Sequence, residues 1–298
     1  MVTEITYNTV RSRSKCVTEY DEDTNMAKMS HKDRVQIEQR WENLDREERE
    51  KKSISYPIRK SNEMIQRSRY SLTLREQRLL LFLISKIQRS DKGDKRYTIK
   101  IRDACRVCGI DADDKEIGGT IYKAVYDAFG ALRNKGFTIY PETGGRVICA
   151  WIEHPHQDEN GDMTFNFDPY IVKYLFDVQK RFTQYRLQAV LRMKSTYGIR
   201  LYELLKSYVN IGSKRFALED LRQLLDADTP SYAKYSFFKM RVLEPAMQDL
   251  ARSDLKVDYI EIKTGRKVVG IEFIITDIHL TAEERLRLEK EYNAPDAL

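Results

Sequence analysis

The chain has 298 residues, of which 41% are hydrophobic and 10% aromatic, so it can bury a sizeable core, and its length favours two domains. The formal net charge is +6 at pH 7, but 33% of the residues are charged, so the distribution of charge is more informative than its sum. It has no run of about 18 apolar residues and no apolar signal-peptide core, so neither membrane insertion nor secretion is supported and we expect a cytoplasmic protein.

Residues 1–52 are rich in charge and poor in large apolar side chains. The exceptions are Ile37, Trp41 and Leu44, which recur at helical spacing. We therefore expect a charged, flexible N-terminal arm with one short helix.

A first folded domain is expected over residues 56–160. Thr73 and Glu76 form the pattern of a capping box before the apolar run LLLFLISKI, which predicts a buried helix. YTIKI alternates like a strand, and RDACRVCGI and IYKAVYDAFGALRNK have helical spacing. FTIY and RVICAWI, joined by PETGG, predict a two-stranded hairpin. Three helices followed by a hairpin are typical of a winged helix.

The same order recurs over residues 163–280. It comprises a helix in IRLYELLKSYV, a strand near Phe216, the helices ALEDLRQLL and YSFFKMRVLEPAMQDLAR, and a hairpin from LKVDYIEI to VVGIEFIITDI. Apolar positions keep one offset of 118 between the copies, as 201 minus 83 and 255 minus 137 illustrate. We predict an α+β fold of two tandem winged-helix domains related by internal duplication, followed by a C-terminal helical tail over residues 281–298.

Two helix-turn-helix units with wings indicate DNA binding. In the helix predicted over residues 236–252, Tyr235, Phe238, Val242, Ala246 and Leu250 have the spacing of a core face. Counting 100° per residue places on the other side Lys234, Phe237, Met240, Arg241, Glu244, Gln248 and Arg252, flanked by Ser236 and Lys239.

This outer face suits base recognition in a major groove. Arg241 can bond guanine in a bidentate way, Phe237 or Met240 can touch a thymine methyl group, and Glu244 can accept from cytosine. Pro245 removes a hydrogen bond to the carbonyl of Arg241 and predicts a kink in the helix. We therefore expect the base contacts to come from residues 234–244.

Other cations are candidates for phosphate contacts, with a solvated surface as the alternative. Lys263, Arg266 and Lys267 surround a glycine turn that suits a wing. Between Arg181 and Arg215, eight cations, including Arg200, accompany a single carboxylate. In the first copy, the third helix carries Lys123 and Arg133 with a weaker charge balance, which suits backbone positioning or protein contact. The first domain is therefore expected to serve dimerisation or backbone contact, and the second to be the main DNA reader.

The strings SNEMI, SLTLREQRLLLFLISKI, IRLYELLKSY, FFKMRVLEPAMQDL and GRKVVGIEFIITDI resemble the RepE/Pi-like family of initiator Rep proteins of iteron-containing theta-replicating plasmids. The resemblance covers about residues 56–280 and places the family's recognition helix on residues 236–252. It does not extend to the N-terminal arm.

The resemblance implies a replication initiator that binds double-stranded plasmid origin DNA at its iterons, promotes opening of the origin, and recruits the host helicase and its loader. It also implies a dimer, formed through the first winged helix, that binds an operator inverted repeat and represses its own gene. Such proteins have no catalytic centre, so we expect no enzyme activity, cofactor or metal, and no membrane partner.

Two other functions remain open. His154 and His156 with Tyr170 and Tyr174 have the residue types of a metal-dependent rolling-circle nicking initiator. However, HPHQDENGD resembles a polar loop, and Pro155 disfavours a central strand. A winged-helix transcription regulator without origin function would use the same reading helix.

Metal and nucleotide chemistry have little support in the sequence. Cys105 and Cys108 form a single CxxC pair without the second pair of a four-sulfur zinc site, so we expect both to pack in the core. Neither a phosphate-binding GxxxxGK[ST] loop nor a GxGxxG pattern occurs.

Overall fold

The computed structural model describes residues 57–88, 90–108, 119–176 and 181–278. The expected arm over residues 1–52 and the expected tail over residues 281–298 lie outside the described residues. Among the helices that are described, none is both long enough and apolar enough to cross a membrane.

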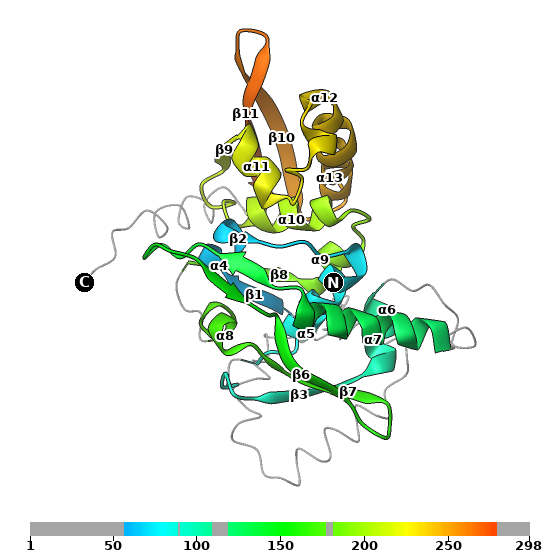
Figure 1. The fold of residues 1–298 in the computed structure, drawn as a ribbon. Helices are drawn as coiled ribbons and strands as arrows, with labels where there is room; N and C mark the ends of the chain where they lie inside the picture. Colours follow the sequence, from blue (N-terminus) through cyan, green and yellow to red (C-terminus); the bar gives the residue numbers. More distant parts are fainter. Residues whose placement is uncertain (1–56, 89, 109–118, 177–180, 279–298) are drawn as a thin grey trace, which may run out of the picture. The chain divides into compact units, whose positions relative to one another are not determined.

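The first winged helix begins with α5 (Leu74–Ile84), which has the expected capping box: Thr73 accepts from the N–H of Glu76, and Glu76 accepts from that of Thr73. β3 (Arg96–Lys100), α6 (Ile101–Val107) and α7 (Gly119–Asn134) follow. The chain then forms β6 (Ile152–Gln157) and β7 (Asp162–Phe167). The antiparallel sheet has the order β3-β7-β6, with β7 in the middle (Figure 1).

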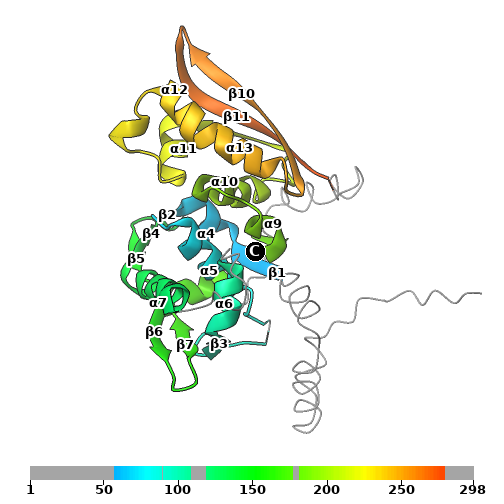
Figure 2. The same cartoon turned by 90° about the vertical axis from the view of Figure 1, so that its right-hand side faces the viewer.

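The second winged helix repeats this plan. It consists of α10 (Thr196–Lys206), β9 (Ser213–Ala217), α11 (Leu218–Leu224), a short 3-10 turn (Pro230–Tyr232), α12 (Tyr235–Phe238), a π-helical turn (Lys239–Leu243), α13 (Glu244–Leu250), β10 (Leu255–Thr264) and β11 (Lys267–Asp277). The sheet order is β10-β11-β9, and α13 packs against β10 (Figure 2).

The shared order confirms two tandem winged helices. The first residues of β9 and β3 are 117 positions apart (213 minus 96), and so are those of α11 and α6 (218 minus 101). The offset in these two elements is one residue smaller than the predicted 118.

The wing of the first domain is a correction to the sequence analysis. The predicted hairpin forms as β4 (Phe137–Ile139) and β5 (Val147–Cys149), but it joins β2 (Ser68–Arg69) in a separate sheet of order β2-β4-β5. β6 and β7 are the true wing, because β7 pairs with β3 as β11 pairs with β9. The predicted equivalence of Leu255 and Phe137 in the two repeats was therefore wrong. β7, which the sequence analysis assigned to the second domain, is part of the first.

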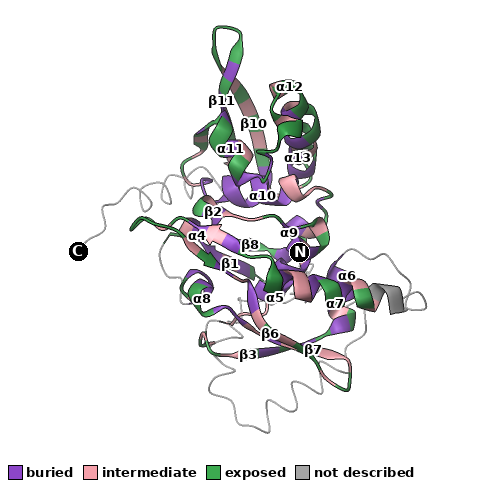
Figure 3. Cartoon of the chain, viewed as in Figure 1, coloured by how far each residue is buried: buried purple, intermediate pink, exposed green. Residues whose placement is uncertain are grey.

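The remaining elements precede the first winged helix or link it to α10. β1 (Pro57–Ser61) pairs with β8 (Phe182–Arg186), and α4 (Asn62–Arg67), α8 (Pro169–Leu175) and α9 (Leu187–Leu191) complete the junction. α10 contacts α4 and α5 on one side and α13 on the other, and every residue from Gly198 to Lys206 is buried (Figure 3). A helix buried on all sides must satisfy its charged residues internally.

One buried ion pair joins β1 to α10. Lys60 Nζ lies 2.7 Å from Glu203 Oε1, and the hydroxyl of Tyr185 donates to the same carboxylate oxygen. Burial lowers the pKa of Lys60, and the neighbouring Glu203 opposes this effect. This contact fixes the first strand of the described chain to the first helix of the second winged helix.

Candidate nucleic-acid interface

The predicted reading helix forms without a break through α12, the π-helical turn and α13. In the wider turn, the N–H of Glu244 donates to the carbonyl of Lys239, five residues earlier. Pro245 follows directly and has no N–H to donate. A π-helical turn therefore lies just ahead of Pro245, where the sequence predicted a kink.

The helix has the two faces that the sequence predicted. Phe238, Val242, Ala246 and Leu250 are at most 1% exposed, and Tyr235 is half-buried. The exposed residues are Lys234, Ser236, Phe237, Met240, Arg241, Glu244, Gln248 and Arg252, whereas Lys239 is intermediate. The candidate reading residues thus share a solvent-facing surface.

Phe237 organises two cations on this surface. The guanidinium carbon of Arg241 lies 5.5 Å from the centre of the Phe237 ring, and Lys234 Nζ lies 5.9 Å from it. Within the described residues, neither cation has an ion pair with a carboxylate. The ring orients both side chains while leaving their N–H groups available to a ligand.

Glu261 on β10 ties the reading helix to the wing. Its Oε1 accepts from the hydroxyl of Tyr235 at 2.8 Å and from Lys239 Nζ at 2.9 Å, and its Oε2 lies 3.3 Å from Lys263 Nζ. The hydrogen bonds from Lys239, Tyr235 and Lys263 lower the pKa of Glu261 to about 2. We call Tyr235, Lys239, Glu261 and Lys263 the wing clamp.

The tip of the second wing is basic. Lys263, Arg266 and Lys267 are exposed around Gly265, whose φ of 60° is the left-handed conformation that glycine adopts readily. Within the described residues, Arg266 and Lys267 have no ion pair. This turn can place its charges against a phosphate backbone.

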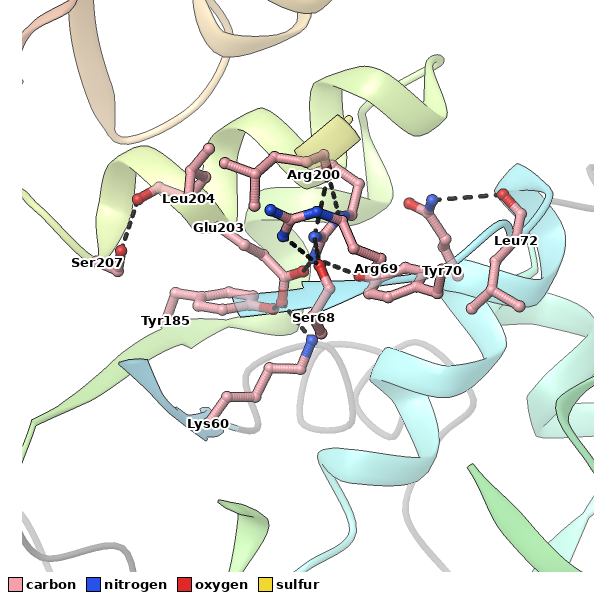
Figure 4. Close-up of polar contacts among 12 residues, drawn as sticks. Lys60, Ser68, Arg69, Tyr70, Leu72, Tyr185, Arg200, Glu203, Leu204 and Ser207 are labelled. Atoms are coloured by element: carbon pink, nitrogen blue, oxygen red, sulfur yellow. Dashed lines mark hydrogen bonds and ion pairs between the residues drawn. The ribbon is translucent and has the colours of Figure 1, made fainter. Parts of the chain in front are cut away.

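Arg200 does not belong to this surface, which corrects the expectation that it contacts DNA. It is 4% exposed, and its guanidinium donates to Tyr70 Oη at 2.7 Å and to the backbone carbonyls of Ser68 and Leu224 (Figure 4). The group also lies over the Tyr70 ring at 4.1 Å. Its donors are used inside the protein, so a phosphate cannot reach them.

The basic stretch from Arg181 to Arg215 is likewise not one surface. Lys206 is buried and lies 2.6 Å from Asp254 and 2.5 Å from Asp277. Arg215 lies 3.0 Å from Glu272. The cations of this stretch therefore do not form the single phosphate-binding surface that was expected, because some are buried in ion pairs and others are exposed.

The first domain presents a different surface. Lys123 and Arg133 are exposed on α7, together with Tyr126. The turn of the first wing carries carboxylates instead of cations, and Asp158 accepts there from the N–H groups of Asn160 and Asp162. An acidic wing turn is unsuited to phosphate, so α7 is the part of this domain that remains a candidate for backbone contact.

The structure corrects the expectation that the two histidines considered for a nicking site lie in a polar loop. His154 and His156 lie on β6 rather than in a loop, and the pairing of β6 with β7 shifts register between Glu153 and His156, across Pro155. Tyr170 is 65% exposed, but Tyr174 is 3% exposed. One of the two candidate nucleophiles is thus inaccessible to DNA.

The cysteines of the first domain pack in the core, as the sequence predicted for Cys105 and Cys108. Both are buried, as is Cys149, and all three are free thiols. Burial raises the pKa of Cys105 to about 11 and that of Cys108 to about 12. Their burial thus agrees with the expected packing role of Cys105 and Cys108.

Two family models match the two winged helices of this chain. A family model described as initiator replication protein, WH1, matches residues 57–206, and one described as initiator Rep protein, WH2, matches residues 217–275. A crystal structure of the Pi initiator protein in complex with iteron DNA is similar at 19% identity and a TM-score of 0.57, covering 75% of this chain and 98% of that chain. Domains 2 and 3 of RctB match at 15% identity and a TM-score of 0.42, covering 71% and 85% of the two chains.

Proposed function

The chain belongs to the initiator replication protein family, and on this premise we propose that it binds repeated duplex sites, or iterons, at a plasmid origin and starts replication there. The observation that carries the proposal is the exposed face of α12 to α13, with Arg241 held beside Phe237 and the wing clamp fixing a basic turn nearby. Such a helix fits a major groove while its wing contacts the backbone.

We divide the candidate DNA-binding residues into two roles. For base contacts we propose Arg241 with guanine, Phe237 and Met240 with thymine methyl groups, and Glu244 with cytosine. For phosphate contacts we propose Lys234, Ser236, Lys239, Arg252, Lys263, Arg266 and Lys267 in the second domain, and Lys123 and Arg133 in the first. Because phosphate contacts carry no direct sequence information, discrimination between sites should depend on the first group.

The proposal includes a dimer, formed through the first domain, that binds an operator inverted repeat and represses the protein's own gene. Ile148 on β5 is 67% exposed and Tyr140, after β4, is 43% exposed. In the described sheet β2-β4-β5, β5 is an outer strand, and an exposed apolar outer strand can pair with a second copy of the chain. Origin opening and recruitment of the host helicase and its loader complete the proposal, supported by family membership.

Fluorescence anisotropy with the full chain tests DNA recognition. A duplex carrying the repeats that flank the gene should bind about 10³-fold or more tightly than a shuffled duplex of equal length. Equal affinities would contradict the proposal. A plasmid that carries the repeats should also replicate only when the chain is supplied, whereas a regulator without origin function would bind the repeats and fail this second assay.

A further inference from the structure

A groove lined by three arginines lies at the C-terminal end of the reading helix. Its volume is about 830 Å³, and its walls come from the first residue of β1, from β8, from α9 with the residue that follows it, and from the segment after α13. Arg186, Arg192 and Arg252 line it and are exposed, and no ion pair joins them to a carboxylate in the described parts of the chain. Three guanidinium groups that have no carboxylate partner among the described residues favour an anionic ligand.

The groove remains positive although a carboxylate also lines it. Among the described residues that form its walls, Asp254 is the one acidic side chain. Lys206 Nζ lies 2.6 Å from Asp254 and is shared with Asp277, so it offsets this negative charge in part, and the three arginines outnumber the single carboxylate of the walls. The other polar side chains at the walls, those of Gln184, Gln188 and Ser253, are neutral.

Asp249 holds the two sides of the groove together. It is 4% exposed, and its two carboxylate oxygens accept from the backbone N–H groups of Lys194 at 2.9 Å and Ser195 at 2.8 Å. This attaches α13 to the segment that follows Arg192. The backbone next to Arg192, the residue that follows α9, is thereby held against the end of α13 near Arg252, so these two sides of the groove are joined before a ligand binds.

Arg252 lies in the turn directly after α13, which ends at Leu250. Leu250 is nine residues after Arg241 (250 minus 241), or about 14 Å along a helix axis, so Arg252 lies just beyond the C-terminal end of the reading helix. A duplex that is read at Arg241 therefore continues toward the groove. An anion bound there would flank the base pair that Arg241 contacts.

We propose that this groove binds a backbone phosphate that flanks the site read by α12 to α13, with Arg186 and Arg192 as further DNA-binding residues. The inference rests on the proposed DNA-binding function. Guanidinium groups bind phosphate oxygens in a bidentate way, and such contacts fix the register of the protein on the duplex without reading its sequence. The DNA contact thus extends from the second winged helix onto β8 and the end of α9.

A salt titration tests the groove in the full chain with its repeat duplex. The double variant Arg186→Gln, Arg192→Gln is compared with Arg96→Gln, Lys100→Gln, which removes two exposed cations from β3. Each lost phosphate contact lowers the slope of log K against log salt by about 0.9, so the groove variant should lose a slope of about 1 to 2 while keeping its preference for the repeat over a shuffled duplex. A groove variant indistinguishable from the β3 variant overturns the inference.

Neutral methylphosphonate linkages locate the contact. Placed one at a time in the flank, they should weaken binding of the unmodified protein at one or two positions and leave the groove variant unaffected there. Equal weakening of both proteins at every position would refute the groove. If the unmodified protein does not prefer its repeats and Arg241→Ala changes nothing, the proposed function itself fails. If the protein prefers its repeats and Arg241→Ala weakens that preference, but the groove variant has no effect, only the groove proposal fails.

Discussion

Lys239 Nζ lies 2.9 Å from Glu261 Oε1, and this contact joins the reading helix to the wing. Both elements approach DNA in a winged helix, so their relative position determines which base pairs and phosphates are contacted together. We therefore test first how much the wing clamp contributes to the stability of the second domain.

The wing clamp should make stability depend on pH in an acidic window. The pKa of Glu261 is lowered from 4.5 to about 2, so its ionised form stabilises the fold fully above about pH 5, and this stabilisation is lost as the pH falls toward 2. Glu261→Gln should cost about 0.5 to 1 kcal/mol at pH 7, because the site is partly solvated.

Chemical unfolding at several pH values measures this effect. The difference between the unmodified chain and Glu261→Gln should shrink between pH 5 and pH 2. Glu272→Gln, which breaks the solvated pair with Arg215, is the matched control and should change stability less. A difference that stays constant down to pH 2 would argue against an ionised Glu261 at the centre of the clamp.

Arg241→Ala should cost about 1 to 3 kcal/mol of binding free energy on the cognate repeat and relax discrimination at one base position. Truncation removes a bidentate donor that the Phe237 ring holds in place. Binding measurements on a set of single-base variants of the repeat give the result. Gln248→Ala, at another exposed position of the same helix, is the control; a loss of equal size on random DNA would reassign Arg241 to phosphate contact.

Arg200→Gln should destabilise the chain by about 3 kcal/mol and leave the base preference of the folded protein unchanged. The substitution leaves the carbonyls of Ser68 and Leu224 without their buried donor and removes a positive charge near Glu203. Thermal unfolding and binding are measured on the same preparation. Full stability with weakened DNA binding would restore the original expectation that Arg200 contacts DNA.

Gly198→Ala should destabilise the packing of α10 against α13 by about 1 to 3 kcal/mol. A Cβ at this position would lie 2.4 Å from Asp249 Oδ2, and Asp249 cannot move without breaking its bonds to Lys194 and Ser195. Gly130→Ala on α7 is the control, because a Cβ there meets nothing within 4 Å and should raise stability by about 0.5 to 1 kcal/mol. Equal unfolding free energies for the two variants would exclude the close approach.

Local sequence signals predicted much of the fold. The capping box at Thr73, the core face of the reading helix and the hairpin from β10 to β11 depend on spacings within a few residues, and all three are present. The first wing was misassigned because two hairpins follow α7 in the chain. Only the pairing of β7 with β3, about 60 residues apart (162 minus 100), identifies the wing, and no local pattern encodes that pairing.

The sequence predicted which residues of the reading helix are exposed, but it predicted less well which cations of the chain are accessible to DNA. From the sequence, Arg200 and Lys206 were expected to be exposed cations. In the structure α10 is enclosed on both sides, and both side chains bond to residues from segments far away in the sequence. The same reason explains why Glu261 was not singled out: its contacts with Tyr235 and Lys239 exist only once β10 folds against the reading helix. Long-range pairing therefore decides which charges remain available to DNA.

DNase footprinting of the full chain on the flanking plasmid DNA tests the central claim most directly. Two winged helices entering successive major grooves should protect about two helical turns for each bound monomer, repeated in tandem along the origin. Protection of a single turn at each site, or of no repeated site at all, would contradict binding of origin repeats by both domains.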